Sequence, residues 1–282
     1  RYYPDPIIEK DQWNVDRDMA QPIWLTAAIP SDAAPGVYKA TFRLTGKTAN
    51  KNFRLEKEIQ IKVYPVAMEE PSLWVTNWFR TSPQKMKTFN GGKDVELYSP
   101  AYWEMIKELA LKLKECYSNV ILISPLQYIE FIEKDGVYAF DYTQFDKMIS
   151  IFKEAGVLKM IEGGHIAGRS GNWDSQFEPY IPEYKDGKKT MVQYPMASEK
   201  AQNFYKQFIP SLMAHLKEQK MGEIYVQHIA DEPISSNIKS YVEIARFVKQ
   251  QAPEIKIIEA CHSHDLENTL DIWVPQLNYY KD

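Results

Sequence analysis

The sequence predicts a mixed α/β protein, in which a (β/α)8-type barrel, truncated after about six strands, follows part of a β-sandwich domain. Two long segments before Pro65 alternate polar and apolar residues, as antiparallel strands with one face in water do. After Pro65, short apolar runs alternate with segments of helical periodicity, which is typical of a parallel sheet with helices outside. No glycine-rich phosphate-binding pattern follows these runs, which disfavours an open, doubly wound sheet.

Residues 1–66 are expected to form the C-terminal part of the β-sandwich. Residues 37–44 and residues 53–63 place their apolar side chains at every second position, so each is expected to be a strand. Residues 23–29 supply another apolar run that we expect to be a strand. These strands are too few for a stable sandwich, so we expect further strands upstream.

Residues 67–282 are expected to form the barrel, which would be incomplete at its C-terminal end. Its expected strands are residues 73–79, 119–125, 157–163, 224–230, 255–261 and 271–277. Helices with one apolar face are expected around Trp103–Leu113, Phe145–Phe152, Phe204–Leu216 and Tyr241–Val248. Residues 164–197 are long for a connection in such a fold and rich in aromatic residues, so we expect a structured loop that shapes a binding site.

Composition excludes several classes of protein. The net charge is −4, and no Lys/Arg stripe marks a nucleic-acid surface. No apolar run approaches the ~20 residues that span a bilayer. The 2 cysteines exclude a disulfide framework, and no cofactor or zinc motif is present. The chain opens with RYYPDP and without a signal peptide, so we expect its natural start, with any export signal, to lie upstream.

Two adjacent carboxylates, Asp231 and Glu232, end the apolar run of residues 224–230 just before a predicted helix. Parallel α/β enzymes keep their chemistry at the carboxyl ends of strands, so a catalytic pair is the favoured interpretation. The alternative is a solvent-exposed acid pair that caps the following helix.

Adjacent acids are poorly placed to straddle a scissile glycosidic bond, which requires carboxyl groups ~5–9.5 Å apart on either side of it. They fit a different scheme, in which one acid protonates the leaving oxygen. The other orients the substrate's own acetamido group, whose carbonyl oxygen attacks the anomeric carbon. The adjacency therefore indicates a 2-acetamido sugar.

Four segments carry a resemblance to a known family: YYPDPI at 2–7, residues 23–42, residues 140–169 ending in EGGHIAGR, and HIADEP at 228–233. They are similar to glycoside hydrolase family 123. The resemblance implies a β-sandwich joined to a (β/α)8 barrel catalytic domain, and a retaining exo-hydrolase that releases terminal β-linked N-acetylgalactosamine. It also implies an exported protein, periplasmic, at the cell surface or secreted.

The family's catalytic pair falls on Asp231 and Glu232. By the resemblance, Glu232 is the general acid and then the base that activates water. Asp231 holds the acetamide and stabilises an oxazolinium-type intermediate. The expected partner is a glycan or glycoconjugate, with no nucleic acid, no membrane span and no cofactor.

Further polar and aromatic residues at strand ends are candidates for binding the sugar. His165 follows two glycines that would let backbone approach a ligand, and Tyr279 could reach the acetamide carbonyl. The remaining candidates are Asn77, Trp78, Trp173, His228, His262 and Gln276. For each, the alternative is packing or loop ordering. A metal site is not expected, because the spacing of His228, Asp231 and Glu232 matches no recognised ligand motif.

Two other functions stay open at this point. A non-catalytic carbohydrate-binding protein built on the same barrel would use the aromatic loop equally well. A structural scaffold would bind no monosaccharide. Burying paired acids without a use is costly, which favours an enzyme.

Overall fold

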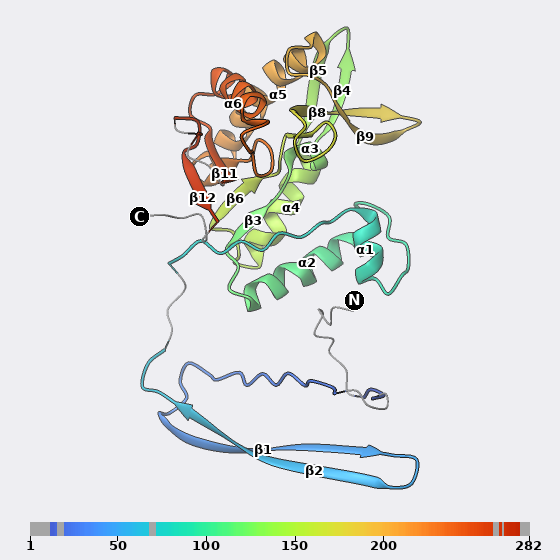
Figure 1. Ribbon diagram of the computed structural model, residues 1–282, viewed down its shortest axis with the longest axis vertical. Coiled ribbons are helices and arrows are strands. Elements are labelled where there is room, and N and C mark those ends of the chain that lie inside the picture. Colours follow the sequence, from blue (N-terminus) through green and yellow to red (C-terminus); the bar gives the residue numbers. More distant parts are fainter. Residues whose placement is uncertain (1–11, 16–19, 68–71, 262–264, 267, 277–282) are drawn as a thin grey trace. The chain divides into compact units, whose positions relative to one another are not determined.

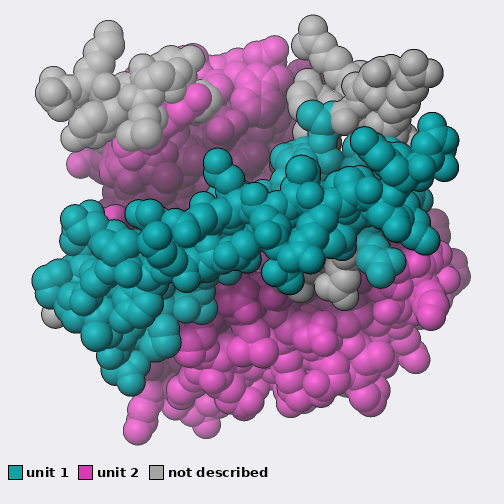
Figure 2. Space-filling model, turned by 90° about the horizontal axis from the view of Figure 1, so that it is seen from below, with its two compact units in different colours: residues 1–70 teal, residues 71–282 magenta. Residues whose placement is uncertain are grey.

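The computed structural model describes residues 12–15, 20–67, 72–261, 265–266 and 268–276 (Figure 1). The chain divides into two compact units, Arg1–Glu70 and Pro71–Asp282, which Figure 2 colours separately. Each unit is described by itself.

The first unit contains a long antiparallel hairpin of β1 (Gly36–Lys47) and β2 (Asn52–Val63). The alternation predicted from the sequence is confirmed, because Tyr38 lies opposite Ile61 on the apolar face. The opposite face is charged, and Arg43 Nε donates to Glu56 Oε1 across the strands at 2.6 Å. Such cross-strand pairs, together with the ladder, hold the two strands in register.

The strand expected at residues 23–29 is wrong. These residues have no regular structure, and their side chains are exposed. A strand needs a neighbouring strand to accept and donate its backbone hydrogen bonds, and no described strand pairs with this segment.

The second unit is built on a curled, parallel five-stranded sheet, a half-barrel, with the strand order β12-β11-β10-β6-β3. Its strands are β3 (Val120–Leu122), β6 (Met160–Gly163), β10 (Tyr225–Gln227), β11 (Lys256–Cys261) and β12 (Ile272–Pro275). Each strand in turn adds to the same edge, so the described strands show none of the order reversal of a doubly wound sheet. The expected strand at 73–79 is reduced to one parallel bridge, Thr76 with Val120.

Asn119 helps to hold residues 73–79 against the sheet, although this segment forms no regular ladder of backbone hydrogen bonds. Its side chain accepts from Val75 N at 2.9 Å and donates to Leu73 O at 2.9 Å. Val75 O also accepts from the backbone N–H groups of Asn119 and Val120, at 2.9 and 3.1 Å. The segment is therefore held by the Asn119 side chain together with a few backbone hydrogen bonds, in place of the full ladder of a strand.

The four helices predicted from periodicity are confirmed as α2 (Pro100–Glu115), α4 (Thr143–Glu154), α5 (Glu199–Glu218) and α6 (Ile238–Gln251). Their apolar faces form the core against the sheet, with Phe204, Phe208, Leu212 and Leu216 of α5 fully buried. Short elements complete the unit: α1 (Pro83–Phe89), α3 (Pro125–Tyr128), a 3-10 turn at Gly222–Ile224, and the hairpin of β4 (Glu130–Lys134) and β5 (Val137–Asp141). No helix in the described part of the chain is long and apolar enough to cross a bilayer.

The long connection after β6 is structured, as predicted. It forms a three-stranded antiparallel sheet of β7 (Ala167–Arg169), β8 (Phe177–Lys185) and β9 (Lys188–Gln193) (Figure 1). The buried Tyr205 of α5 fastens this insertion, since its hydroxyl donates to Ile166 O at 2.9 Å and to Tyr180 O at 2.6 Å. The insertion is thereby fixed to the core beside the ends of β6 and β10.

Candidate active site

The candidate site lies at the carboxyl ends of three neighbouring strands. Strand β10 pairs in parallel with β6 on one side and with β11 on the other. Backbone hydrogen bonds between the two segments continue past the ends of β6 and β10. Ile166 N and Ala167 N both donate to Ile229 O, at 3.1 and 2.9 Å. The segments that follow β6 and β10 therefore stay side by side.

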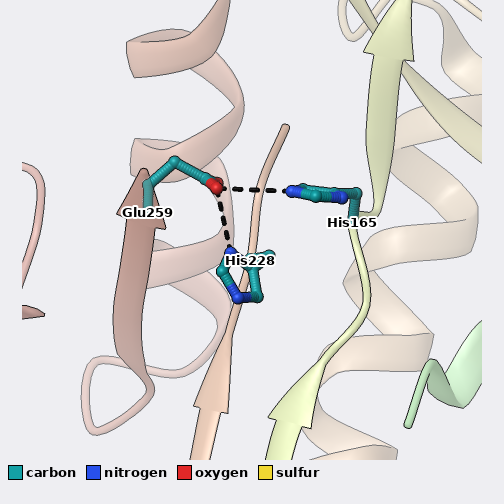
Figure 3. Close-up of side chains that lie close together, drawn as sticks. All are labelled: His165, His228 and Glu259. Carbon is teal, nitrogen blue, oxygen red and sulfur yellow. Dashed lines mark hydrogen bonds and ion pairs between the residues drawn. The ribbon is translucent and has the colours of Figure 1, made fainter. Parts of the chain in front are cut away.

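Glu259 of β11 is the centre of the site (Figure 3). Its carboxylate is fully buried, and Oε1 accepts from His228 Nδ1 at 2.9 Å and from His165 Nε2 at 3.3 Å. Oε2 accepts from the backbone N–H groups of Ile229 and Ala230, at 3.1 and 3.2 Å, and from the Tyr241 hydroxyl at 3.3 Å. Burial alone would raise the pKa of Glu259, but the two histidines lower it below its ordinary value.

His228 lies between two buried carboxylates. Burial opposes its charged form, but Glu162 and Glu259 outweigh burial and raise the pKa of His228 to about 9. Its Nε2 lies 3.7 Å from Glu162 Oε2, within ion-pair range but without a hydrogen bond in the described part of the chain. At neutral pH His228 is therefore an imidazolium, which compensates the two negative charges on either side.

Trp78 closes the site on the side of Glu162. Its indole N–H donates to Glu162 Oε2 at 2.7 Å, and Thr76 Oγ1 donates to the same oxygen at 3.3 Å. The indole meets the rings of His165 and His228 edge to face, at centroid distances of 5.5 and 5.3 Å. Trp78 is 46% exposed, so part of its ring is available to a ligand.

Asp231 and Glu232 follow in the turn after β10. Asp231 Oδ1 lies 3.9 Å from His165 Nε2, and its side chain is about half exposed, at 52%. Glu232 is partly buried and has a left-handed backbone, with φ of 44°. Neither acid is the N-cap residue of α6, because the residue before this helix is Asn237, whose Oδ1 accepts from Ile234 N at 2.9 Å.

The structure brings together four of the predicted residues: His165, His228, Trp78 and Asp231. Glu232 adjoins them along the chain. Two predicted residues have other contacts or positions. Asn77 is exposed and donates to Ser118 Oγ at 3.2 Å, and Gln276 is exposed one residue beyond β12.

Trp173 lies in the insertion and is 49% exposed. The Arg169 guanidinium lies 3.7 Å from the centroid of its ring, so one face of the indole is occupied. His262 and Tyr279 lie outside the described residues.

The sequence-based prediction missed Glu162, Glu259 and Arg169. Glu162 and Glu259 each follow apolar residues inside a short strand, MIEG and KIIEAC. An acid in a strand buried on both faces is costly unless it has partners, and that signal could have found both. Arg169 had no such signal, because it begins the polar stretch RSGNWDSQ at residues 169–176.

Among the described residues, His165, His228 and Glu259 are the group that could hold a metal ion, with ligand atoms within 4.8 Å of one another. A hydrogen-bonded array accounts for the same geometry, because both Glu259 oxygens already accept from donors. An ion would have to displace the protons that the imidazoles share with Glu259. The arrangement fits proton-sharing better than metal binding.

Comparison with known proteins gives two family matches. The catalytic domain of glycoside hydrolase 123 matches residues 83–282, and the glycoside hydrolase 123 N-terminal domain matches residues 1–46. No curated protein matched the chain.

Among solved structures, a family 123 glycoside hydrolase from Clostridium perfringens, analysed for the details of glycolipid glycan hydrolysis, has a TM-score of 0.58 at 16% identity. The match covers 89% of this chain but 46% of that one, so the present chain spans about half of that enzyme. A GH39 enzyme from Xanthomonas axonopodis pv. citri has a TM-score of 0.39 at 16% identity, covering 61% of this chain and 37% of that chain.

Proposed function

Because the chain belongs to the glycoside hydrolase 123 family, we propose that it carries the catalytic site of an exo-glycosidase that releases terminal β-linked N-acetylgalactosamine from glycans. The observation that carries this proposal is the position of Asp231 and Glu232. They follow β10 at the carboxyl edge of the parallel sheet, and Asp231 lies beside His165. The fold match to an enzyme studied for glycolipid glycan hydrolysis is compatible with a glycoconjugate substrate.

We propose a substrate-assisted, retaining mechanism. In the first step Glu232 donates its proton to the glycosidic oxygen as the bond from that oxygen to the anomeric carbon breaks. The carbonyl oxygen of the substrate's acetamido group forms a bond to the anomeric carbon from the opposite face, which gives an oxazolinium-type intermediate. In the second step water attacks the anomeric carbon, Glu232 takes a proton from that water, and the acetamido group is restored.

Asp231 would accept a hydrogen bond from the acetamido N–H and offset the positive charge that develops on the oxazolinium ring. Its half-exposed side chain leaves room for this contact. His165, 3.9 Å away, would hold the carboxylate in place. Trp78 offers an exposed ring edge or face on which a sugar can pack.

The other candidates remain proposals for binding the sugar or its aglycone, directly or through a neighbouring residue: His228, Asn77, Trp173, Tyr279, His262 and Gln276. His228 would act through Glu162 and Glu259, because it is almost fully buried. Trp173 could offer only the ring face that Arg169 does not cover.

For the larger architecture we propose that residues 1–66 belong to a β-sandwich and residues 67–282 to a (β/α)8 barrel. The exposed apolar face of the β1–β2 hairpin supports the first part, and the sequential parallel strand order supports the second. We also propose that the protein is exported, periplasmic, at the cell surface or secreted.

A chromogenic aryl 2-acetamido-2-deoxy-β-D-galactopyranoside tests the function. The wild-type protein, with its full chain, should hydrolyse it, and Glu232→Gln should lower kcat by about 10²–10⁴-fold, the range for removing a general acid. Glu243→Gln, at an exposed position on α6, is the matched control and should keep wild-type activity. Tight sugar binding without turnover, unchanged by Glu232→Gln, would favour the non-catalytic carbohydrate-binding alternative.

The mechanism has its own test. Proton NMR of the first product should show the β-anomer before mutarotation, as retention requires. Asp231→Ala should be inactive and should stay inactive in azide. Rescue by azide with an inverted product would contradict substrate assistance, because it would mean that Asp231 is replaceable by an external nucleophile.

A further inference from the structure

Glu232 has a backbone conformation that L-residues rarely adopt. Its φ of 44° lies in the left-handed region, where a residue with a Cβ is strained. The conformation also has a geometric effect. Consecutive residues of an extended strand point to opposite faces, whereas a left-handed residue turns the chain so that this alternation is broken. Strain of this kind persists only where the surroundings impose it.

Arg169 of β7 contacts the strained peptide directly. Its Nη2 donates to Glu232 O at 2.8 Å, across 63 residues of sequence. The same guanidinium is fixed on its other sides, because Nε donates to Trp173 O at 2.8 Å and the group lies 3.7 Å from the centroid of the Trp173 ring. Phe177 lies on a further side, with its ring centroid 5.0 Å from the guanidinium. A planar guanidinium held at this many points is a rigid donor.

The surrounding insertion is fastened to the segment that follows Glu232. Gln176 Nε2 donates to Ser236 O at 2.7 Å, and Phe177 N donates to Ser240 Oγ at 2.9 Å. The buried Asn237 donates to the Trp173 and Ser175 carbonyls at 3.1 and 3.2 Å. Residues 169–177 therefore form a fixed base for Arg169.

The segment before Asp231 is fixed from the other direction. Glu259 accepts from the N–H groups of Ile229 and Ala230, while Ile229 O accepts from the start of the insertion. The peptide between Ala230 and the start of α6 is thus held at both ends. Arg169 contacts the left-handed residue itself, through the hydrogen bond to its carbonyl oxygen.

We propose that Arg169 is a positioning residue for Glu232, and that the β7–β9 insertion is a working part of the active site. By holding the Glu232 carbonyl, Arg169 keeps the backbone left-handed and directs the carboxyl that donates the proton. The inference rests on the proposed function, since it assigns a purpose to the geometry of the general acid. Trp173 contributes by fixing the guanidinium.

The test compares two variants. Arg169→Met keeps an unbranched side chain but removes the hydrogen-bond donors, whereas Arg169→Lys keeps the positive charge and a single donor group. Arg246→Met, at an exposed position on α6, is the matched control. The measurement is kcat/KM, in the full chain, across aryl 2-acetamido-β-galactosides whose leaving groups range from dinitrophenol to methoxyphenol. Departure of dinitrophenolate needs no proton, so its rate is insensitive to the position of the acid.

Arg169→Met should lower kcat/KM about 10²-fold for the methoxyphenyl substrate, as for a general acid displaced by about 1 Å, and less than about 3-fold for the dinitrophenyl substrate. For Arg169→Lys, kcat/KM on the methoxyphenyl substrate should lie between the values for Arg169→Met and wild type. If Arg169→Met does not fold, Arg169→Lys takes its place in the test. Equal losses on all leaving groups, or none, would overturn the proposal, because a merely structural role does not depend on the leaving group.

Crystal structures of wild type and the Arg169 variant give an outcome that does not need activity. The backbone of residue 232 should leave the left-handed region in the variant. If it keeps its conformation with its carbonyl in place, the proposal fails whatever the kinetics show. If wild type hydrolyses none of the substrates, the proposed function fails, and the conformation of residue 232 alone decides whether Arg169 holds it.

Discussion

Replacing Glu259 with glutamine removes a buried negative charge to which both site histidines donate. The carboxylate accepts five hydrogen bonds, two at Oε1 and three at Oε2. A glutamine side chain has one carbonyl oxygen, and its NH2 group is itself a donor. Whichever way the amide is turned, donors face donors on one side. Either the imidazoles of His165 and His228 or the donors at Oε2 lose their acceptor.

The cost can be worked from the pKa of His228. The rise of the pKa from the ordinary 6.5 to about 9 in the folded state corresponds to about 3 kcal/mol of favourable interaction with Glu162 and Glu259, net of the cost of burial. Orphaned buried donors cost about 1–3 kcal/mol more. Glu259 supplies only part of the interaction with His228, because Glu162 supplies the rest. That part and the orphaned donors together give an expected loss of about 3–5 kcal/mol in the free energy of unfolding near neutral pH, the range for breaking a buried charged pair.

The pH dependence has a definite sign. The pKa of His228 is raised in the folded state, so its contribution to the free energy of unfolding is fully present below about pH 6.5 and is lost as the pH rises through about 9. The free energy of unfolding of the wild type should therefore fall by up to about 3 kcal/mol between these two pH values. Glu259→Gln should show a much smaller loss, because His228 then has one carboxylate partner instead of two.

Urea unfolding of the full chain at several pH values from about 6 to about 9.5 measures both effects. Glu243→Gln, an exposed position on α6, controls for removal of a glutamate charge as such. The reasoning is refuted if Glu259→Gln unfolds within about 1 kcal/mol of wild type, or if the slope between pH 6.5 and 9 is the same in both proteins.

Gly164→Ala should destabilise the protein by about 1–3 kcal/mol in urea unfolding, because the added Cβ would lie 2.6 Å from Ser124 Cβ and 3.1 Å from its Cα. Gly222→Ala, where nothing lies within 4 Å, should change the unfolding free energy little, and equal effects at the two sites would argue against the clash. Tyr205→Phe should cost about 1–3 kcal/mol, because two backbone carbonyls lose their shared hydroxyl donor, and an unchanged midpoint would count against this anchor of the insertion. Trp78→Phe removes the indole donor to the buried carboxylate of β6 and should raise KM for the aryl galactosaminide; a KM within error of wild type would exclude a role in binding.

Most helices and strands could be predicted because the spacing of apolar residues along the sequence differs between the two. The stripe of Phe204, Phe208, Leu212 and Leu216 recurs at helical spacing, and α5 buries all four of these side chains, together with neighbours such as Tyr205 and Ile209. The alternation in residues 37–44 predicted β1 for the same reason. Residues 23–29 have strand-like composition but no described pairing partner, so local pattern alone gave the wrong answer there.

Part of the candidate site was predictable from chain order. Because β6 and β10 are parallel, residues that follow them reach the same edge of the sheet, which is why His165 and Asp231 were both candidates. The roles within that edge were not predictable. His228 was a candidate for contact with the sugar, yet it is buried between Glu162 and Glu259.

The amino-acid sequence by itself determined the type of most helices and strands, the acid pair at the end of β10 and the family to which the chain belongs. These follow from periodicity and motif, which are properties of neighbouring residues. Only the tertiary structure decided that Glu259 accepts hydrogen bonds from both histidines and that Arg169 donates to the carbonyl of the left-handed Glu232. Both contacts join residues far apart in sequence. They depend on strand order, on the path of the insertion and on the direction of each side chain, none of which a local pattern encodes.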